Sequence, residues 1–335
     1  MVTDAGHGAF RDRLRLIYDE VRIDDGTIVH SRLGRLRESP DMEAKGAPLL
    51  SHLWRLIYLC YHAGDERASR LLVDGSRATT PIHGWEEPEA VARMEAAHAS
   101  RWTLSRGWTV VDRGAVIRAT RSGVHLLCRP QEVDGDQADG DGQVALRMPA
   151  TQRYTLSGWL VLHGELGSGR PDHVFVRHYL SLHDVGSAAR AIRTLSAKLN
   201  QARVRHHIKV ANNAMSLRRR DAFILYSEEP SAPLVEPVVR DVVESGLVDA
   251  SYTMPLFAEQ VLPGWSTAVE SRHQDPSLSY GQACARATSL GVIEAGERGA
   301  RTFADWYAAV SEQFEASGIG PSPSPSPSHR PGGAP

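Results

Sequence analysis

The chain has little lysine and little net charge, and each shortage excludes some classes of protein. Only three of its 38 basic residues are lysines, and its formal net charge is −2. It therefore lacks the bulk basicity of a dedicated nucleic-acid binder. No run approaches the ~18 apolar residues of a membrane span, and the first residues carry no apolar signal segment. We expect a cytoplasmic protein with neither a nucleic-acid nor a membrane partner.

Cysteines and metal-binding patterns are also scarce. Cys60, Cys128 and Cys284 lie far apart and form no CxxC or Cys/His spacing, which argues against a disulfide framework or a structural zinc site. The acidic run 134–142 resembles a calcium loop, but Ala138 stands at the fifth ligand position and no glutamate closes it. No kinase, zincin or α/β-hydrolase motif occurs. We expect no metal and no cofactor.

Hydrophobic periodicity predicts the fold class. Residues 1–104 have helical spacing, and from Gly107 short β-branched runs indicate an antiparallel meander. Further strands are expected at 143–148, 157–163, 173–182, 204–211 and 222–227, and helices at 185–200, 238–245, 280–295 and 303–314. Because strands and helices mix without a βαβ rhythm, we predict an α+β fold with a mostly antiparallel central sheet flanked by helices.

The same pattern predicts three parts of the chain. A helical N-terminal region, 1–104, is expected to pack on an α+β domain, 105–318. The Pro/Ser-rich tail, 319–335, has the composition of a disordered segment.

One segment, 203–220, holds five arginines and a lysine and no acidic residue. Such a run is either a solvated face or a local positive field that attracts anions. Strand alternation places His207 and Lys209 on one face, with His206 on the other. Lysine can lose a proton where arginine cannot, so a lysine retained among arginines is a candidate for acid–base work on an anionic substrate.

A second pair, Arg177 and Tyr179, shares a face of the strand VFVRHYLSL. Arginine suits bidentate phosphate contacts and tyrosine adds a hydroxyl donor. The alternative is an arginine–carboxylate pair across the sheet with the tyrosine in the core. Asp221 directly follows the arginine triplet, a position from which it can orient one guanidinium. Ser279 is a candidate N-cap for the helix expected at 280–295, whose N-terminus is either capped only or also holds an anion.

The stretch 176–230, VRHYLSLHDV through FILYSEEP, resembles the HopA-type effector family. It is similar in particular to members encoded beside class V lanthipeptide and thioamitide clusters. Further matches lie at Gly107-Trp108, at YTLSGWLVLHGELG (154–167), at DPSLSYGQ (275–282) and at FEASGIGPSPS. The resemblance implies a lyase that eliminates phosphate from Ser or Thr of a precursor peptide, after phosphorylation by a separate kinase-like partner.

The resemblance also implies site residues. The family's arginine–tyrosine strand falls on Arg177 and Tyr179, its strand lysine on Lys209, and its arginine–aspartate pair on Arg219 and Asp221. In that mechanism Arg177 and Arg219 clamp the phosphate. Lys209 is the candidate base and His207 the candidate acid. If bound phosphate keeps the lysine charged, Lys209 instead stabilises the enolate and His207 or another base takes the proton.

The chain departs from the family pattern at several positions. It has His206 where the family has an aromatic, Gln274 in place of Glu before Asp-Pro, and Tyr280 followed by Cys284 where the family has phenylalanine and an arginine. These departures keep two alternatives open. One is a non-catalytic peptide-binding or scaffolding partner of the kinase, and the other is a module that recognises a phosphoprotein without changing it.

Overall fold

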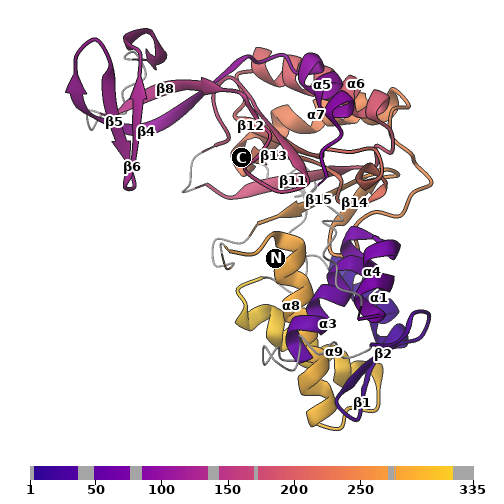
Figure 1. Cartoon of the computed structure of the whole chain (residues 1–335). Helices are drawn as coiled ribbons and strands as arrows, with labels where there is room; N and C mark the ends of the chain where they lie inside the picture. Colours follow the sequence, from indigo (N-terminus) through magenta and orange to yellow (C-terminus); the bar gives the residue numbers. More distant parts are fainter. Residues whose placement is uncertain are drawn as a thin grey trace, which may run out of the picture.

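The computed structural model describes residues 4–36, 49–75, 85–134, 143–169, 173–270, 275 and 277–319. Gln274 and the Pro/Ser tail beyond Ile319 lie outside these residues. The fold is α+β, with antiparallel sheets, of which the central one lies between helical layers (Figure 1). Within the described part of the chain, no helix is both long and apolar enough to cross a bilayer.

The central sheet has seven strands in the order β14-β15-β11-β13-β12-β10-β9, and each neighbouring pair is antiparallel. The prediction of a mostly antiparallel central sheet is therefore confirmed. Its strands are β9 (Thr151–Gln152), β10 (Trp159–His163), β11 (Phe175–Leu180), β12 (His206–Ala211), β13 (Phe223–Glu228), β14 (Glu259–Leu262) and β15 (Trp265–Val269). Strands β14 and β15 were not predicted. Residues 265–268 of β15 are all buried, so the polar alternation that identifies a half-exposed strand is missing.

Three helices cover one face of this sheet (Figure 1). They are α5 (Pro88–Ala97), α6 (Val185–Gln201) and α7 (Ala232–Glu244). Alternate strand residues such as Leu160, Ile208 and Leu225 join the same buried cluster as Ile192 and Val239 of the helices. The predicted helix 238–245 in fact begins at Ala232, with Pro233 in its first turn, where proline is tolerated, and with Pro237 inside it.

A second helical layer lies against the opposite face of the sheet (Figure 1). Its members are α1 (Asp4–Glu20), α3 (Leu49–Ile57), the π-helical turn η1 (Tyr58–Ala63), α4 (Glu66–Val73), α8 (Tyr280–Glu297) and α9 (Phe303–Ala316). The two ends of the described chain meet here, since Phe10 packs edge-to-face on Phe314 at 5.5 Å between ring centroids. The helical N-terminal region is confirmed. It also contains a small antiparallel sheet that was not predicted, formed by β1 (Val21–Asp24), β2 (Thr27–His30) and β3 (Gly34–Arg35).

The predicted meander forms a separate five-stranded arm that projects from the body (Figure 1). Its strands are β4 (Trp102–Arg113), β5 (Ile117–Arg121), β6 (Val124–Cys128), β7 (Val133–Asp134) and β8 (Val144–Pro149). The arm has its own small core around Trp108, Ile117 and Leu146. Short 3₁₀ turns complete the described chain at η2 (Pro130–Glu132), η4 (Ser216–Arg218) and η5 (Glu229–Ser231).

Candidate active site

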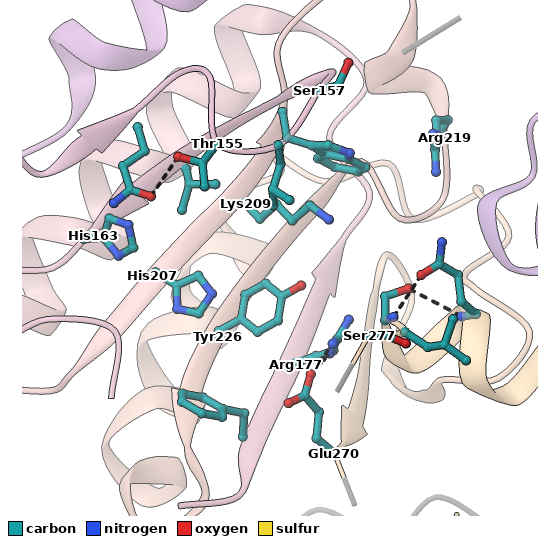
Figure 2. A pocket seen from close by; sticks show the side chains of 18 of the residues that line it. Thr155, Ser157, His163, Arg177, His207, Lys209, Arg219, Tyr226, Glu270 and Ser277 are labelled. Carbon is teal, nitrogen blue, oxygen red and sulfur yellow. Dashed lines mark hydrogen bonds and ion pairs between the residues drawn. The ribbon is translucent and has the colours of Figure 1, made fainter. Parts of the chain in front are cut away.

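A cavity of about 1100 Å³ lies between the central sheet and the second helical layer. Strands β10, β11, β12 and β13 supply its floor, and η1 and the start of α8 supply its opposite wall. Among the described residues, three cationic side chains line it: Arg177, Lys209 and Arg219. In the same part of the chain one carboxylate, that of Glu270, lines it with them. The predicted cationic residues are therefore brought together in one cavity (Figure 2), Arg177 from β11, Lys209 from β12 and Arg219 from the turn that precedes β13.

Strand register explains why these side chains converge. Directly opposite residues on antiparallel strands point to the same face. One row across the sheet runs His163, His207, Tyr226, Arg177, and the adjacent row on that face includes Lys209. The predicted placement of His207 and Lys209 on one face is confirmed, because both line the cavity while His206 is buried on the other side.

Lys209 has the most unusual environment of the cations. Among the described residues, its ammonium has no hydrogen-bond or ion-pair partner, and it lies 4.1 Å from the centroid of the Trp159 ring. Burial is the main cause that lowers the pKa of Lys209 to about 8. Asp221 opposes this effect, and the charges of Arg177 and Arg219 add to it. A neutral amine is therefore accessible near neutral pH.

Arg219 is held by a buried carboxylate. Its Nε and Nη2 each donate to one oxygen of Asp221 at 2.9 Å, so Asp221 orients the guanidinium as predicted. Tyr58 of η1 donates to Asp221 at 2.6 Å and accepts from Arg219 Nη2 at 3.1 Å. The guanidinium carbon of Arg219 lies 5.3 Å from the Trp159 centroid. Trp159 thus contacts both Lys209 and Arg219.

Arg177 pairs with a carboxylate and an aromatic ring. Its Nε donates to Glu270 at 2.6 Å, and Nη2 contacts the same oxygen. Its guanidinium carbon lies 4.9 Å from the centroid of the Tyr226 ring. The predicted alternative for this residue, a carboxylate pair across the sheet, is present, because Glu270 directly follows β15, the neighbour of β11. Arg177 nevertheless lines the cavity.

Sequence comparison assigns the chain to a family. The model of the HopA1 effector protein family matches residues 153–324, a little over half of the chain. The chain belongs to the HopA1 effector protein family. No curated protein matches it. The matched region begins at the foot of the arm and includes every strand that builds the cavity floor.

Two solved structures resemble this HopA1-family chain along almost its whole length. The effector protein from Pseudomonas syringae pv. tomato strain DC3000 is 13% identical, covers 95% of each chain and has a TM-score of 0.46. The effector protein from Pseudomonas syringae pv. syringae strain 61 is 15% identical, covers 97% of this chain and 98% of its own, and has a TM-score of 0.44.

His207 also lines the cavity, and the ring of Tyr226 lies between it and Arg177. Its ring stacks on Tyr226 at 4.2 Å between centroids with an 11° angle between planes. Burial, with the nearby His163, His206 and Arg177, lowers the pKa of His207 well below 6.5. The imidazole is therefore neutral at pH 7 in the unliganded cavity.

Not all predicted residues reach the cavity. Tyr179 is fully buried, packs edge-to-face on His62 of η1, and does not line the cavity. Within the basic segment, Lys209 and Arg219 line it, while Arg203 and Arg218 are exposed. The segment is thus divided between the cavity and the solvated surface.

The start of α8 closes the cavity opposite the sheet. Ser279 caps the helix as predicted: its hydroxyl accepts from Gln282 N at 3.4 Å, and Gln282 Oε1 accepts from Ser279 N at 2.9 Å. Both residues line the cavity, with Ser277 beside them (Figure 2). Cys284 is fully buried in the helical core instead, so that departure from the family pattern lies outside the cavity.

Sequence reasoning did not select four residues that shape the site: Tyr58, Trp159, Tyr226 and Glu270. Trp159 and Tyr226 stand inside the family-like stretches, which is the signal that the sequence offers for them. Tyr58 and Glu270 come from segments far away in sequence, and no local pattern marks them. Within the described residues, no group of three or more His, Cys, Asp or Glu side chains has the arrangement of a metal site.

Proposed function

We propose that this protein is a phosphoserine/phosphothreonine lyase that acts on a peptide. It eliminates phosphate from a side chain phosphorylated by a separate kinase-like protein, and it leaves dehydroalanine or dehydrobutyrine. We further propose that the substrate is a precursor peptide of a natural product and that the two proteins form a complex in the cytoplasm. The sequence resemblance to lyases of lanthipeptide and thioamitide clusters supports this proposal.

The observation that carries the proposal is Lys209. This lysine has no carboxylate partner among the described residues, and burial lowers its pKa to about 8. At pH 7 about a tenth of such a lysine is neutral, and the free energy needed to deprotonate its ammonium is about 1.4 kcal/mol. A free lysine with a pKa of ~10.4 would cost about 4 to 5 kcal/mol under the same conditions. The cavity therefore supports a general base at this position.

The arginines supply the other requirement, a binding site for the leaving group. A phosphorylated side chain carries close to two negative charges, which planar guanidiniums bind through paired hydrogen bonds. Arg177 and Arg219 line the cavity with Lys209 (Figure 2). In the proposed complex these guanidiniums bind the phosphate while the α-carbon lies near the amine. Bound phosphate raises the pKa of the lysine, and the two guanidiniums oppose that rise.

The volume of the cavity fits a peptide rather than a free amino acid. Cavities of about 300–1000 Å³ hold drug-sized ligands, and this one reaches about 1100 Å³. Its rim includes polar side chains from two separate segments, Gln152 and Thr155 on one side and Ser277 on the other. These groups can bind the peptide backbone on either side of the phosphorylated residue.

A second candidate function is a non-catalytic peptide-binding or scaffolding partner of the kinase. The ion pairs favour it, because Arg177 already binds Glu270 and Arg219 already binds Asp221. An incoming phosphate has to share these guanidiniums with carboxylates. A protein that only presents a peptide needs no free base, however, and the unpaired lysine argues for chemistry.

A synthetic phosphoserine peptide separates the two functions. The purified protein is incubated with the peptide, free phosphate is measured, and the peptide is examined for the dehydrated residue by mass spectrometry and thiol addition. A lyase releases phosphate and forms an alkene that adds thiols. Binding without release supports the scaffolding role and refutes the lyase.

A further inference from the structure

Tyr226 occupies the centre of the cationic cavity and is fixed on both sides of its ring. The imidazole of His207 stacks on it at 4.2 Å, and the guanidinium carbon of Arg177 lies 4.9 Å from its centroid. The residue is 7% exposed, yet it lines the cavity. Such packing leaves the ring little freedom and directs the hydroxyl to one place.

That place is the space between the proposed base and the proposed clamp. Figure 2 shows the Tyr226 hydroxyl pointing into the cavity between the ammonium of Lys209 and the guanidinium of Arg177. The register agrees, because Lys209 lies opposite Ile224 and is therefore a diagonal neighbour of Tyr226 on the same face. Diagonal neighbours are within reach of long and aromatic side chains.

Elimination of phosphate needs a proton donor at this point. The bond between the β-carbon and the bridging oxygen breaks, and the leaving group departs more easily if that oxygen receives a proton. His207 is a neutral imidazole at pH 7, and it lies on the far side of the Tyr226 ring from Arg177. The tyrosine hydroxyl extends further towards the cations than the imidazole does (Figure 2).

We propose that Tyr226 is the catalytic acid of the elimination, with His207 as a residue that positions its ring. This inference rests on the proposed lyase function and adds the identity of the proton donor. Neutral Lys209 takes the α-proton, and the electron pair of the Cα–H bond forms the double bond as the Cβ–O bond breaks. The hydroxyl of Tyr226 gives its proton to the departing oxygen, so hydrogen phosphate leaves. The Lys209 ammonium then returns a proton to the phenolate, and both groups are restored.

Arg177 and Lys209 stabilise the phenolate that forms when Tyr226 gives up its proton. A cation over the face of the ring and an ammonium near the oxygen both stabilise the negative charge. Burial raises the pKa of Tyr226, Arg177 lowers it, and Glu270 and Asp221 add smaller increases. The hydroxyl therefore stays protonated at rest and can give up its proton where the leaving oxygen becomes basic.

The test uses Tyr226→Phe and two peptides of one sequence, one with phosphoserine and one with O-sulfoserine. Sulfate leaves as a stable anion without protonation, so it needs no acid. We expect Tyr226→Phe to slow phosphate elimination by about 100- to 10 000-fold, the usual contribution of an acid catalyst, and to slow sulfate elimination by less than about tenfold. Lys209→Ala should abolish both reactions, because each requires removal of the α-proton.

Two controls keep the result specific. Tyr61→Phe also removes a buried hydroxyl, one that donates to Glu20 at 2.9 Å outside the cavity, and it should leave both rates unchanged. Phosphopeptide affinity and the thermal midpoint of Tyr226→Phe should stay close to those of the wild type. Equal loss of both reactions, or no loss of phosphate elimination, overturns the role of Tyr226. A wild-type protein that processes neither peptide instead refutes the lyase function itself.

Discussion

The ammonium of Lys209 lies over the face of Trp159, 4.1 Å from the ring centroid. The guanidinium of Arg219 reaches the same ring at 5.3 Å. One aromatic side chain therefore holds the proposed base beside one half of the proposed phosphate clamp. This contact stabilises the charged form of the lysine, while burial favours the neutral form. The balance between the two decides how much free base the cavity contains.

Lys209→Ala should stop dehydration while phosphopeptide binding remains. The variant removes the base but leaves both arginines in place, so incubation with kinase and peptide should accumulate the phosphorylated peptide. Lys209→Arg is the matched control, because it keeps the positive charge but cannot lose a proton in a protein. Both variants should be inactive. If either variant still dehydrates the peptide fully, Lys209 is not the group that takes the α-proton.

The rate of elimination should rise with pH through about 8. Lys209 acts as a base only when neutral, and its pKa is lowered to about 8. The fraction of neutral amine increases about tenfold per pH unit below that value and levels off above it. Measurement of kcat/KM from pH 6 to 9.5 on one phosphoserine peptide tests this. A rate that falls across this range would show that the active group is protonated.

Much of the sheet could be predicted from the sequence. Apolar and polar residues alternate clearly along a strand that has one face buried and the other face lining a cavity. This is how Lys209 and His207 were assigned to one face. The hairpin of β14 and β15 escaped detection, since the buried run of β15 has no polar alternation. Residues such as Tyr58 and Glu270 join the site only through long-range packing, which local periodicity does not encode.

The composition of segment 203–220 also predicted a larger cluster of cations than the structure contains. Six cations close together in sequence suggested one positive field, but alternation and the following turn send them in different directions. Lys209 and Arg219 line the cavity, Arg220 donates to the carbonyl of Tyr61, and Arg218 is exposed. A charge run alone cannot predict this division, because each direction depends on the backbone path after β12.

Trp159→Leu should shift the pH–rate profile to lower pH. Loss of the aromatic face removes a cation–π contact worth about 0.5–2 kcal/mol, which otherwise favours the ammonium. The apparent pKa of Lys209 should fall by up to about 1.5 units at 1.4 kcal/mol per unit. Trp159→Phe retains an aromatic face and should shift it less. An unchanged profile in the leucine variant would show that the ring does not influence the base.

Asp221→Ala should destabilise the protein by about 3–5 kcal/mol, because it leaves the guanidinium of Arg219 buried without its charge partner. Asp221 is 3% exposed, and its carboxylate binds both Arg219 and Tyr58. Chemical denaturation measures the change. The double variant Arg219→Met/Asp221→Leu should recover most of the stability but bind phosphopeptide poorly. If the double variant is as unstable as the single one, the loss comes from packing rather than from the unpaired charge.

The fold should lose stability on mild acidification, because several histidines are buried in neutral form. Burial lowers the pKa of His62 and of His206 to about 4, and that of His178 to about 3. An unfolded histidine has a pKa near 6.5, so between pH 6.5 and 4 the unfolded chain binds more protons and stability falls as pH falls. Between pH 7 and 5 each such group should cost on the order of 2 kcal/mol.

Denaturant unfolding at pH 7, 6 and 5 measures this slope directly. His178→Met provides the control, since both ring nitrogens of His178 lack a hydrogen-bond partner among the described residues and methionine has a similar volume. The variant should reduce the pH dependence by about one proton and be relatively more stable at pH 5. A free energy of unfolding that stays constant from pH 7 to 5 would mean that these histidines reach water in the folded protein, contrary to their burial.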